Sequence, residues 1–174
     1  MEAHARTHDG WPSLSLGLPE TAPPLVSAAA TLRVETTAPL EIIDLTDRVE
    51  AFLGAVDLRT GWVNVQSRHT TTGFVVNEHE PLLLEDLAGL LERLAPRDAD
   101  YAHDALHRRA NVPPDERPNG HSHAKAALLR TSESLNVAGA RLQLGRWQRI
   151  LLVELDGPRE REVSVVALGH GGRR

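Results

Sequence analysis

The sequence predicts an α+β fold, in which a few helices pack on a largely antiparallel sheet to form a single compact domain. Two patterns favour this fold class: short stretches alternate apolar and polar residues as half-buried strands do, and leucine-rich stretches carry the spacing of amphipathic helices. The chain has 174 residues and 41% hydrophobic content, enough for one domain with a substantial core.

The N-terminal residues are expected to lie outside the domain. Residues 1–27 mix Gly, Pro, Ser, Thr and charges without periodicity, so we divide the chain into a leader (1–27), the domain (28–170) and a short tail (171–174). The first strand is expected near "TLRVETT", where Leu32 and Val34 alternate with polar residues. A helix should follow in "LTDRVEAFLGAV", because Thr46 can cap it and its apolar residues share one face.

The middle of the chain predicts a hairpin and a second helix. In "GWVNVQSRHTTTGFVVNEHEP" an alternating strand runs into the turn-like "TTTG" and a second strand follows, which places His69 beside the bend. Pro81 then opens a helix with a stripe of leucines, and Pro96 ends it. We expect an antiparallel hairpin followed by an amphipathic helix.

The C-terminal half is expected to add a loop, a short helix and another hairpin. Residues 97–117 are charged and contain Pro113 and Pro114, so they should form a long loop, with room for a helical turn, of the kind that often carries function. A helix is expected from about His123 to Thr131. The segments "RLQLGRWQRILLVELDG" and "REVSVVALG" flank a "DGPR" turn and predict a hairpin of long strands.

Composition restricts the partners of the protein. The net charge of −5 and the pI near 6.0 provide no basic field for nucleic acid or for an acidic membrane surface. The leader has no secretory pattern and no segment approaches the length of a membrane span, so we expect a cytoplasmic protein. Because the chain has no Cys, a transition-metal site would have to be built from His, Asp and Glu.

Four histidines stand out by position: His69 at a strand end, His103 in the long loop, and the pair His121 and His123 at a helix start. Residues two apart lie about 200° apart on a helix, so only one imidazole of the pair can point inward, and we favour His123. If three of these rings converge, they could hold a divalent ion with an open coordination position. Without a metal they could act as acid and base near neutral pH, with Glu78 as a partner. The alternative that each ring is an ordinary hydrogen-bonded histidine stays open, since no dedicated metal motif such as HExxH is present.

A carboxylate in the last hairpin also needs a partner. Glu154 falls among aliphatic neighbours in "RWQRILLVELDGPRER", and Arg159 or Arg161 could pair with it or could bind an anionic substrate. An ordinary cross-strand ion pair is the competing interpretation. Trp147 is expected in the core. The sequence contains no GxSxG, Walker or GxGxxG motif, so the corresponding hydrolase, P-loop and dinucleotide-binding folds have no support.

Four motifs in order, "HTTTGFVVNEHEP", "YAHD", "NGHSHAKAALL" and "GRWQRILLVELDGPRER", resemble the YjbQ family of secondary thiamine-phosphate synthase-like proteins. The resemblance covers residues 32–169. It implies a homotrimer with sites near subunit contacts and a divalent metal ion, zinc or magnesium, bound by histidines. The matching positions imply catalytic residues Glu78, His103, Lys125, Glu154 and Arg159, substrate-binding residues Thr70, Asn77, Tyr101, Gln148 and Arg161, and metal ligands His69, His103 and His123. Two positions depart from the family pattern, Arg130 and Arg146, and they could alter the pocket.

The resemblance implies an enzyme that joins a pyrimidine methyl diphosphate to a thiazole phosphate and releases diphosphate. Such a reaction needs the charge of the leaving diphosphate to be neutralised and two rings to be held in line. Two alternatives remain: a metal-dependent hydrolase, in which a bound water is the nucleophile, and a non-enzymatic trimeric binding protein for a small phosphorylated metabolite.

Overall fold

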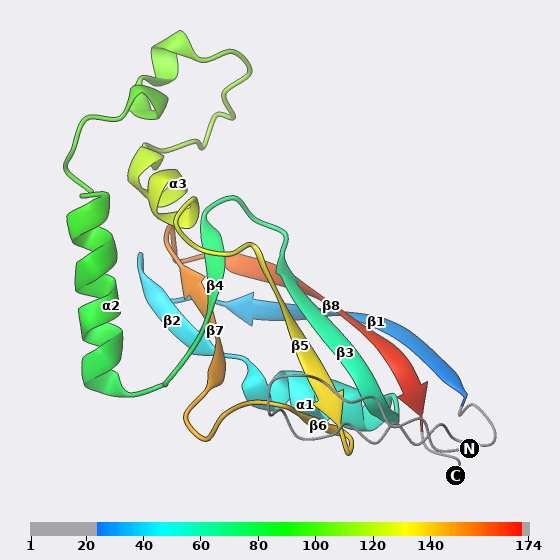
Figure 1. Ribbon diagram of the computed structural model, residues 1–174. Helices are drawn as coiled ribbons and strands as arrows, with labels where there is room; N and C mark the ends of the chain where they lie inside the picture. The colour runs from blue at the N-terminus through cyan, green and yellow to red at the C-terminus, as the bar shows by residue number, and fades with distance from the viewer. Residues whose placement is uncertain (1–23, 172–174) are drawn as a thin grey trace, which may run out of the picture.

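A computed structural model describes residues 24–171, which form two antiparallel sheets and three α-helices (Figure 1). The larger sheet has the strand order β1-β8-β3-β5-β6 and the smaller one β2-β7-β4. The strands are β1 (Leu25–Glu35), β2 (Glu41–Asp44), β3 (Leu58–Ser67), β4 (Thr72–Asn77), β5 (Ser132–Ala138), β6 (Arg141–Leu142), β7 (Arg149–Glu154) and β8 (Glu160–Gly171). The helices are α1 (Thr46–Ala55), α2 (Pro81–Leu94) and α3 (Gly120–Ala126), with two short 3-10 turns, η1 (Ala102–Asp104) and η2 (Leu106–Arg108). The predicted α+β class is therefore confirmed.

The first and last strands pair along their whole length. Leu25 lies opposite His170 and Glu35 lies opposite Glu160, so β1 begins three residues before the expected boundary at residue 28. The rest of the predicted leader, residues 1–23, and the tail residues 172–174 lie outside the described residues. No helix among residues 24–171 has the length and apolar character needed to cross a bilayer.

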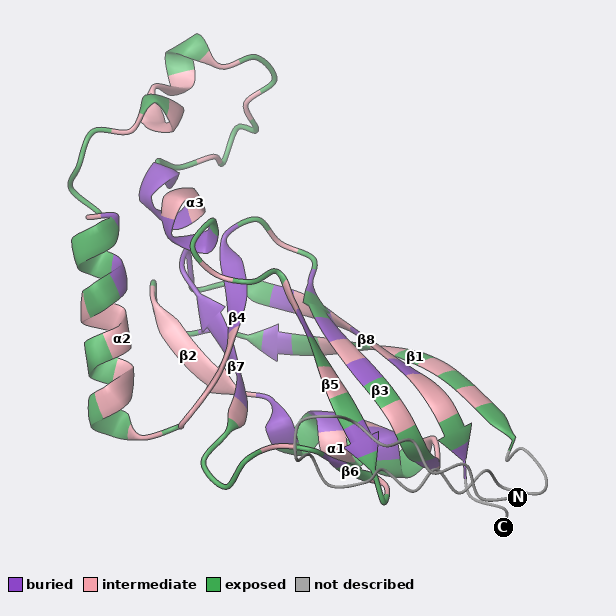
Figure 2. Cartoon of the chain, viewed as in Figure 1, coloured by how far each residue is buried: buried purple, intermediate pink, exposed green. Residues whose placement is uncertain are grey.

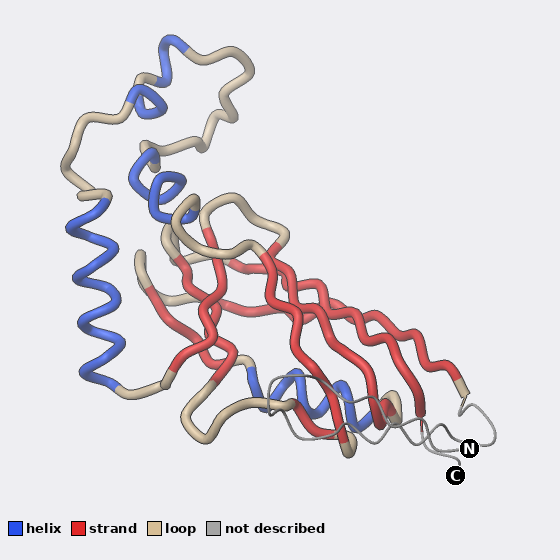
Figure 3. The backbone as a smooth tube through the Cα atoms, in the orientation of Figure 1, coloured by secondary structure: helices blue, strands red, loops and turns tan. Residues whose placement is uncertain are grey.

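Neither long hairpin that the sequence predicts is formed. β3 and β4 lie in different sheets, and so do β7 and β8. The reason is that β3 is already paired on both edges, by β8 and β5, and β7 is paired on both edges by β2 and β4. At residues 68–71 and again at 155–159 the chain therefore crosses from one sheet to the other (Figure 3).

The main core lies between the two sheets and α1. It includes Val49 of α1, Val65 of β3 and Val165 of β8, all fully buried. A second, smaller apolar cluster forms on the other face of the small sheet, where Leu91 of α2 packs with Val153. The burial pattern in Figure 2 agrees with this arrangement, since β7 is buried along almost its whole length while α2 is mostly exposed. The small sheet is therefore the middle layer of the molecule.

Two of the three helices, α1 and α3, differ from the prediction at their starts. Thr46 does not cap α1; its hydroxyl instead accepts a hydrogen bond from the Ile150 amide at 2.8 Å, and the Asp44 carboxylate accepts from the Thr46 amide at 2.8 Å. For α2 the start is at Pro81, as the sequence predicts, and the Glu80 carboxylate accepts from the first free amides. The third helix begins at Gly120 and not near residue 123, because the Asp104 carboxylate accepts from the Gly120 amide at 2.7 Å.

Trp147 is not a core residue. Its side chain is 58% exposed, and the guanidinium carbon of Arg146 lies 4.5 Å from the centre of its ring. The adjacent Gln148 folds back to accept a hydrogen bond from the Gly145 amide at 2.7 Å, so these residues form a turn. Strand β7 begins only at Arg149, and the ring is left outside the layers that cover the small sheet.

Candidate functional site

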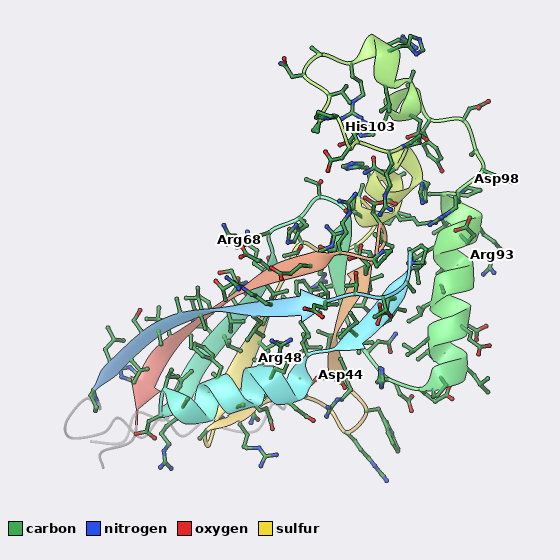
Figure 4. The ribbon with its side chains drawn as sticks, turned by 180° about the vertical axis from the view of Figure 1, so that it is seen from behind. Asp44, Arg48, Arg68, Arg93, Asp98 and His103 are labelled. Carbon is green, nitrogen blue, oxygen red and sulfur yellow. The ribbon has the colours of Figure 1, made fainter. Side chains whose placement is uncertain are left out.

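A polar cavity of about 410 Å³ lies where the two crossings between the sheets meet η1 and the start of α3. All of its lining residues are polar or charged, with four arginines against two carboxylates. They are Arg68, His69, Thr70, Thr71, His103, Arg109, Glu116, Asn119, His123, Asp156, Arg159 and Arg161. Figure 4 shows Arg68 at the crossing between β3 and β4 and His103 in the loop that stands above α3. The surplus of positive charge makes the cavity suited to an anionic ligand.

A buried ion pair forms the wall of the cavity on the β7 side. Arg161 donates to both carboxylate oxygens of Glu154 at 2.5 Å and also to the Thr71 hydroxyl at 3.0 Å. Glu154 is fully buried and accepts further hydrogen bonds from the amides of Leu155 and Asp156. Of the two arginines that the sequence offered for Glu154, the structure selects Arg161. The pair fixes the guanidinium group at the cavity in a bidentate geometry.

A second carboxylate, Asp156, holds another part of the wall. It accepts from the Asn119 side-chain amide at 3.1 Å and from Arg159 at 2.9 Å, and Arg117 lies 3.2 Å from its other oxygen. Burial by itself would raise the pKa of Asp156, but the hydrogen bond from Asn119 and the charges of Arg159 and Arg117 outweigh it and lower the pKa. Asp156 is therefore a fixed anion that orients Asn119 and Arg159.

His103 and His123 form a pair in the same cavity. Their ring centres are 4.6 Å apart and the rings meet edge to face at 64°. Burial lowers the pKa of His123, and the neighbouring His103 lowers it further. Within residues 24–171, the Nε2 atom of His103 is buried without a hydrogen-bond partner, as is Oδ1 of Asn119. The imidazole of His123 is thus neutral at pH 7 and able to accept a proton.

His69 approaches the cavity from the other side. The backbone amide of Glu162 donates to its Nε2 atom at 2.8 Å. Burial lowers the pKa of His69, and the positive charge of Arg161 lowers it further. The His69 ring is therefore neutral, with one of its two nitrogens already occupied.

The cavity fits only part of the predicted three-histidine metal centre. A metal ligand must offer a free lone pair, and the Nε2 lone pair of His69 is taken by the Glu162 amide. The unpartnered Nε2 of His103, beside the ring of His123, does fit a ligand. In the part of the chain that the structure describes, no group of three or more His, Asp and Glu side chains is arranged to hold a metal ion.

The sequence and the fold both match known proteins. A family model described as UPF0047 protein YjbQ-like matches residues 30–170. The chain belongs to this family. Two relatives are a UPF0047 protein of Archaeoglobus fulgidus, 44% identical over 79% of this chain and 98% of its own length, and YugU of Bacillus subtilis, 32% identical over 80% and 98%.

Solved structures of other proteins share the fold. A YbjQ-like protein of unknown function from Sulfolobus solfataricus P2 superposes with a TM-score of 0.75 at 30% identity, covering 84% of this chain and 99% of that one. A hypothetical protein from Aeropyrum pernix K1 gives a TM-score of 0.73 at 36% identity, covering 82% and 99%. These matches confirm the family resemblance and the fold class.

The structure of this YjbQ-like protein brings together six of the predicted site residues: His69, Thr70, His103, His123, Arg159 and Arg161. His121, the other member of the "HSH" pair, faces away from the cavity and its ring lies 6.5 Å from the ring of Tyr101. Only His123 of the pair lines the cavity, as expected, but the expectation that His121 would not point inward is wrong, because His121 is the more deeply buried of the two.

Several other predicted residues lie outside the cavity. Lys125 is buried and pairs with Glu92 of α2 at 2.5 Å, and Glu154 lies behind Arg161. Tyr101 donates its hydroxyl to the Pro96 carbonyl, and its ring packs against Gly120. These side chains contact other parts of the protein and not the space in which a ligand of the cavity would lie.

The remaining predicted residues gather at the far end of β4. Glu78 lines a separate surface hollow together with Arg146 and Trp147. Asn77 accepts a hydrogen bond from the Glu78 amide, and Gln148 is folded onto its own turn. Within one chain, Glu78 is therefore not a partner of the three cavity histidines.

The sequence reasoning missed six of the lining residues, which are Arg68, Thr71, Arg109, Glu116, Asn119 and Asp156. Four of them lie in or next to motifs that the sequence singles out: Arg68 precedes His69, Thr71 lies in "HTTTG", Asn119 opens "NGHSH", and Asp156 opens the "DGPR" turn. Their position in crossings and loops, next to candidate histidines, is the signal that could have found them. Arg109 and Glu116 lie within the long charged loop and carry no comparable local signal.

Proposed function

We propose that the cavity binds the phosphate group of a small phosphorylated metabolite and that the protein is an enzyme acting on it. The supporting observation is that two arginines at the cavity are held in place by some of their guanidinium nitrogens and keep another one free. Arg159 uses Nε and Nη2 to bind Asp156, and Arg161 uses Nε and Nη2 to bind Glu154 and Thr71. Neither Nη1 donates to another residue within 24–171, so each rigid guanidinium group keeps a donor for a ligand at the cavity.

The first candidate reaction is of the thiamine-phosphate synthase type. The thiazole ring nitrogen would attack the methylene carbon of the pyrimidine substrate, and the bond from that carbon to the diphosphate oxygen would break. The arginines would stabilise the negative charge that develops on the leaving diphosphate. A divalent ion, zinc or magnesium, is proposed at His103 and His123, where it would offset phosphate charge.

A second candidate reaction is hydrolysis of a phosphate ester. It is favoured by the lining of the cavity, which contains no apolar side chain and no aromatic ring other than imidazole among the described residues. Two heterocycles held in line would ordinarily pack on apolar or aromatic surface. Hydrolysis requires only the phosphate subsite, a water and a base, and His123 could serve as that base.

The assembly and the cellular location are further proposals that rest on the family resemblance. A homotrimer is supported by several exposed leucines on and beside α2, namely Leu82, Leu90, Leu94 and Leu128. Light scattering on the purified protein would measure the subunit number. A cytoplasmic location is proposed with it, and no nucleic-acid or membrane partner is expected.

The decisive experiment compares binding with turnover. Calorimetric titration with inorganic phosphate and diphosphate tests the anion site, and Arg159→Met should weaken both. Incubation with the pyrimidine and thiazole substrates, and separately with a panel of phosphate monoesters, then distinguishes the two reactions, each with and without added zinc or magnesium. Binding without turnover would favour the non-enzymatic binding protein, and no binding of phosphate or diphosphate would refute the proposal.

A further inference from the structure

The ring of His69 takes the place of a backbone group at the edge of β8. β3 pairs with β8 as far as Ser67, which lies opposite Val163. One step further, the Arg68 amide donates to the Glu162 carbonyl at 3.3 Å. The Glu162 amide then donates not to a backbone carbonyl but to Nε2 of His69, at 2.8 Å. The side chain therefore completes the ladder where the backbone turns toward the small sheet.

This contact fixes the position of the ring proton. A backbone N–H group can only donate, so Nε2 of His69 must carry a lone pair. A neutral imidazole has one protonated nitrogen, and the proton must therefore be on Nδ1. Burial and the charge of Arg161 both lower the pKa of His69 and keep the ring neutral at pH 7. In this state neither nitrogen has a free lone pair.

The protonated nitrogen is available to the cavity. His69 lines it beside Thr70 and Arg161, and no described residue accepts a hydrogen bond from Nδ1. Although Nδ1 has no partner among the described residues, it is not buried, so solvent can reach it. A neutral N–H donor next to a fixed guanidinium group is an arrangement that recognises an oxyanion.

We propose that His69 donates its Nδ1–H to a phosphate oxygen of the ligand, beside Arg161, and is not a metal ligand. The inference deepens the proposed function and takes the identity of the anion from it. It divides the three histidines by role: His69 belongs to the anion subsite, whereas His103 and His123 form the pair that is free to exchange protons or to bind an ion.

Two substitutions separate the two hydrogen bonds of the ring. In His69→Gln the longer amide can place its oxygen where Nε2 lies and still accept from Glu162, but it leaves no donor at the Nδ1 position. In His69→Asn the shorter amide can place its NH2 group at the Nδ1 position, while the Glu162 amide loses its acceptor. The first variant should lose ligand affinity and the second should lose stability.

The probes are inorganic phosphate and diphosphate, measured by calorimetry, with thermal unfolding as the measure of stability. Since a hydrogen bond to a charged group is involved, His69→Gln should weaken binding about tenfold or more at a melting temperature near that of the wild type. His69→Asn should bind within a few-fold of the wild type and melt at a lower temperature. Equal phosphate affinity in the wild type and the Gln variant would overturn the proposal.

Zinc titration and nitrogen NMR provide readouts that do not depend on turnover. Zinc affinity should be the same in the wild type and in His69→Gln; a loss of zinc affinity in that variant, with phosphate binding intact, would show that His69 is a ligand and overturn the inference. The ¹⁵N shifts of the wild-type ring should show a protonated Nδ1 and an unprotonated Nε2, and the reverse pattern would also overturn it. If the wild type bound neither anion, the proposed function and the ligand assigned to His69 would both fail. The ¹⁵N shifts would still show whether the His69 ring is a hydrogen-bond donor at Nδ1 or is free to bind a metal there.

Discussion

The buried pair of Glu154 and Arg161 should be the most sensitive electrostatic contact in the domain. Glu154 has no exposed surface and Arg161 has a side-chain exposure of 5%. Substitution Arg161→Met would leave the carboxylate buried without a countercharge, because its remaining partners are the Thr36 hydroxyl and two backbone amides. Removing one partner of a buried ion pair costs about 3–5 kcal/mol of unfolding free energy.

The double variant Glu154→Met with Arg161→Met should be more stable than Arg161→Met alone. It removes both charges, and the Leu155 amide keeps a hydrogen bond to the Thr71 carbonyl at 3.1 Å. Relative to Arg161→Met, only the Asp156 amide newly loses its partner, at a cost of about 1–3 kcal/mol, because the Thr71 hydroxyl has already lost Arg161 in the single variant. The gain relative to the single variant would show that the uncompensated charge, and not the missing side-chain volume, causes the loss.

Urea unfolding followed by circular dichroism would measure these differences. The matched control is Arg59→Met, since Arg59 forms an exposed ion pair with Asp57 and its removal should cost no more than about 1 kcal/mol. A double variant less stable than Arg161→Met, or losses of the single variants Arg161→Met and Glu154→Met that simply add, would refute the electrostatic explanation.

Three further predictions concern other parts of the chain. Glu92→Gln should destabilise the protein more than Lys125→Met in urea unfolding, because the first leaves a buried ammonium group unpaired and the second leaves a half-exposed carboxylate that water can solvate. Gly120→Ala should cost about 1–3 kcal/mol, since the new Cβ would lie 2.4 Å from a tyrosine Cβ, whereas Gly54→Ala, with no atom within 4 Å, should be neutral or stabilising; equal effects would contradict the packing argument. Burial and the charge of Lys125 lower the pKa of His121. Below about pH 6.5 the unfolded state therefore binds more protons than the folded state, and the free energy of unfolding decreases as the pH is lowered. The difference in unfolding free energy between the wild type and His121→Gln should therefore shift against the wild type from pH 7 to pH 5, and a constant difference would contradict it.

The sequence by itself determined the fold class, the leucine-striped helix and the family. Helix α2 starts at Pro81 as predicted because its signals, a proline at the first turn and leucines at helical spacing, act over a few residues. The alternation in β7 likewise places Ile150 and Leu152 in one core cluster and Val153 in the other. Helical spacing predicted that His121 and His123 face different directions, and of the two only His123 lines the cavity while His121 is the more deeply buried.

Only the tertiary structure decided which strands pair and which polar residues meet. β3 and β4 are joined by a short turn-like segment, but strands from distant parts of the chain occupy both edges of β3, so the chain must cross to the other sheet. That crossing carries His69 to the Glu162 amide, 93 residues further along the chain, and the second crossing brings Asp156 and Arg159 to the same cavity. Sheet pairing depends on long-range competition for strand edges, and side-chain spacing within a segment carries no information about it.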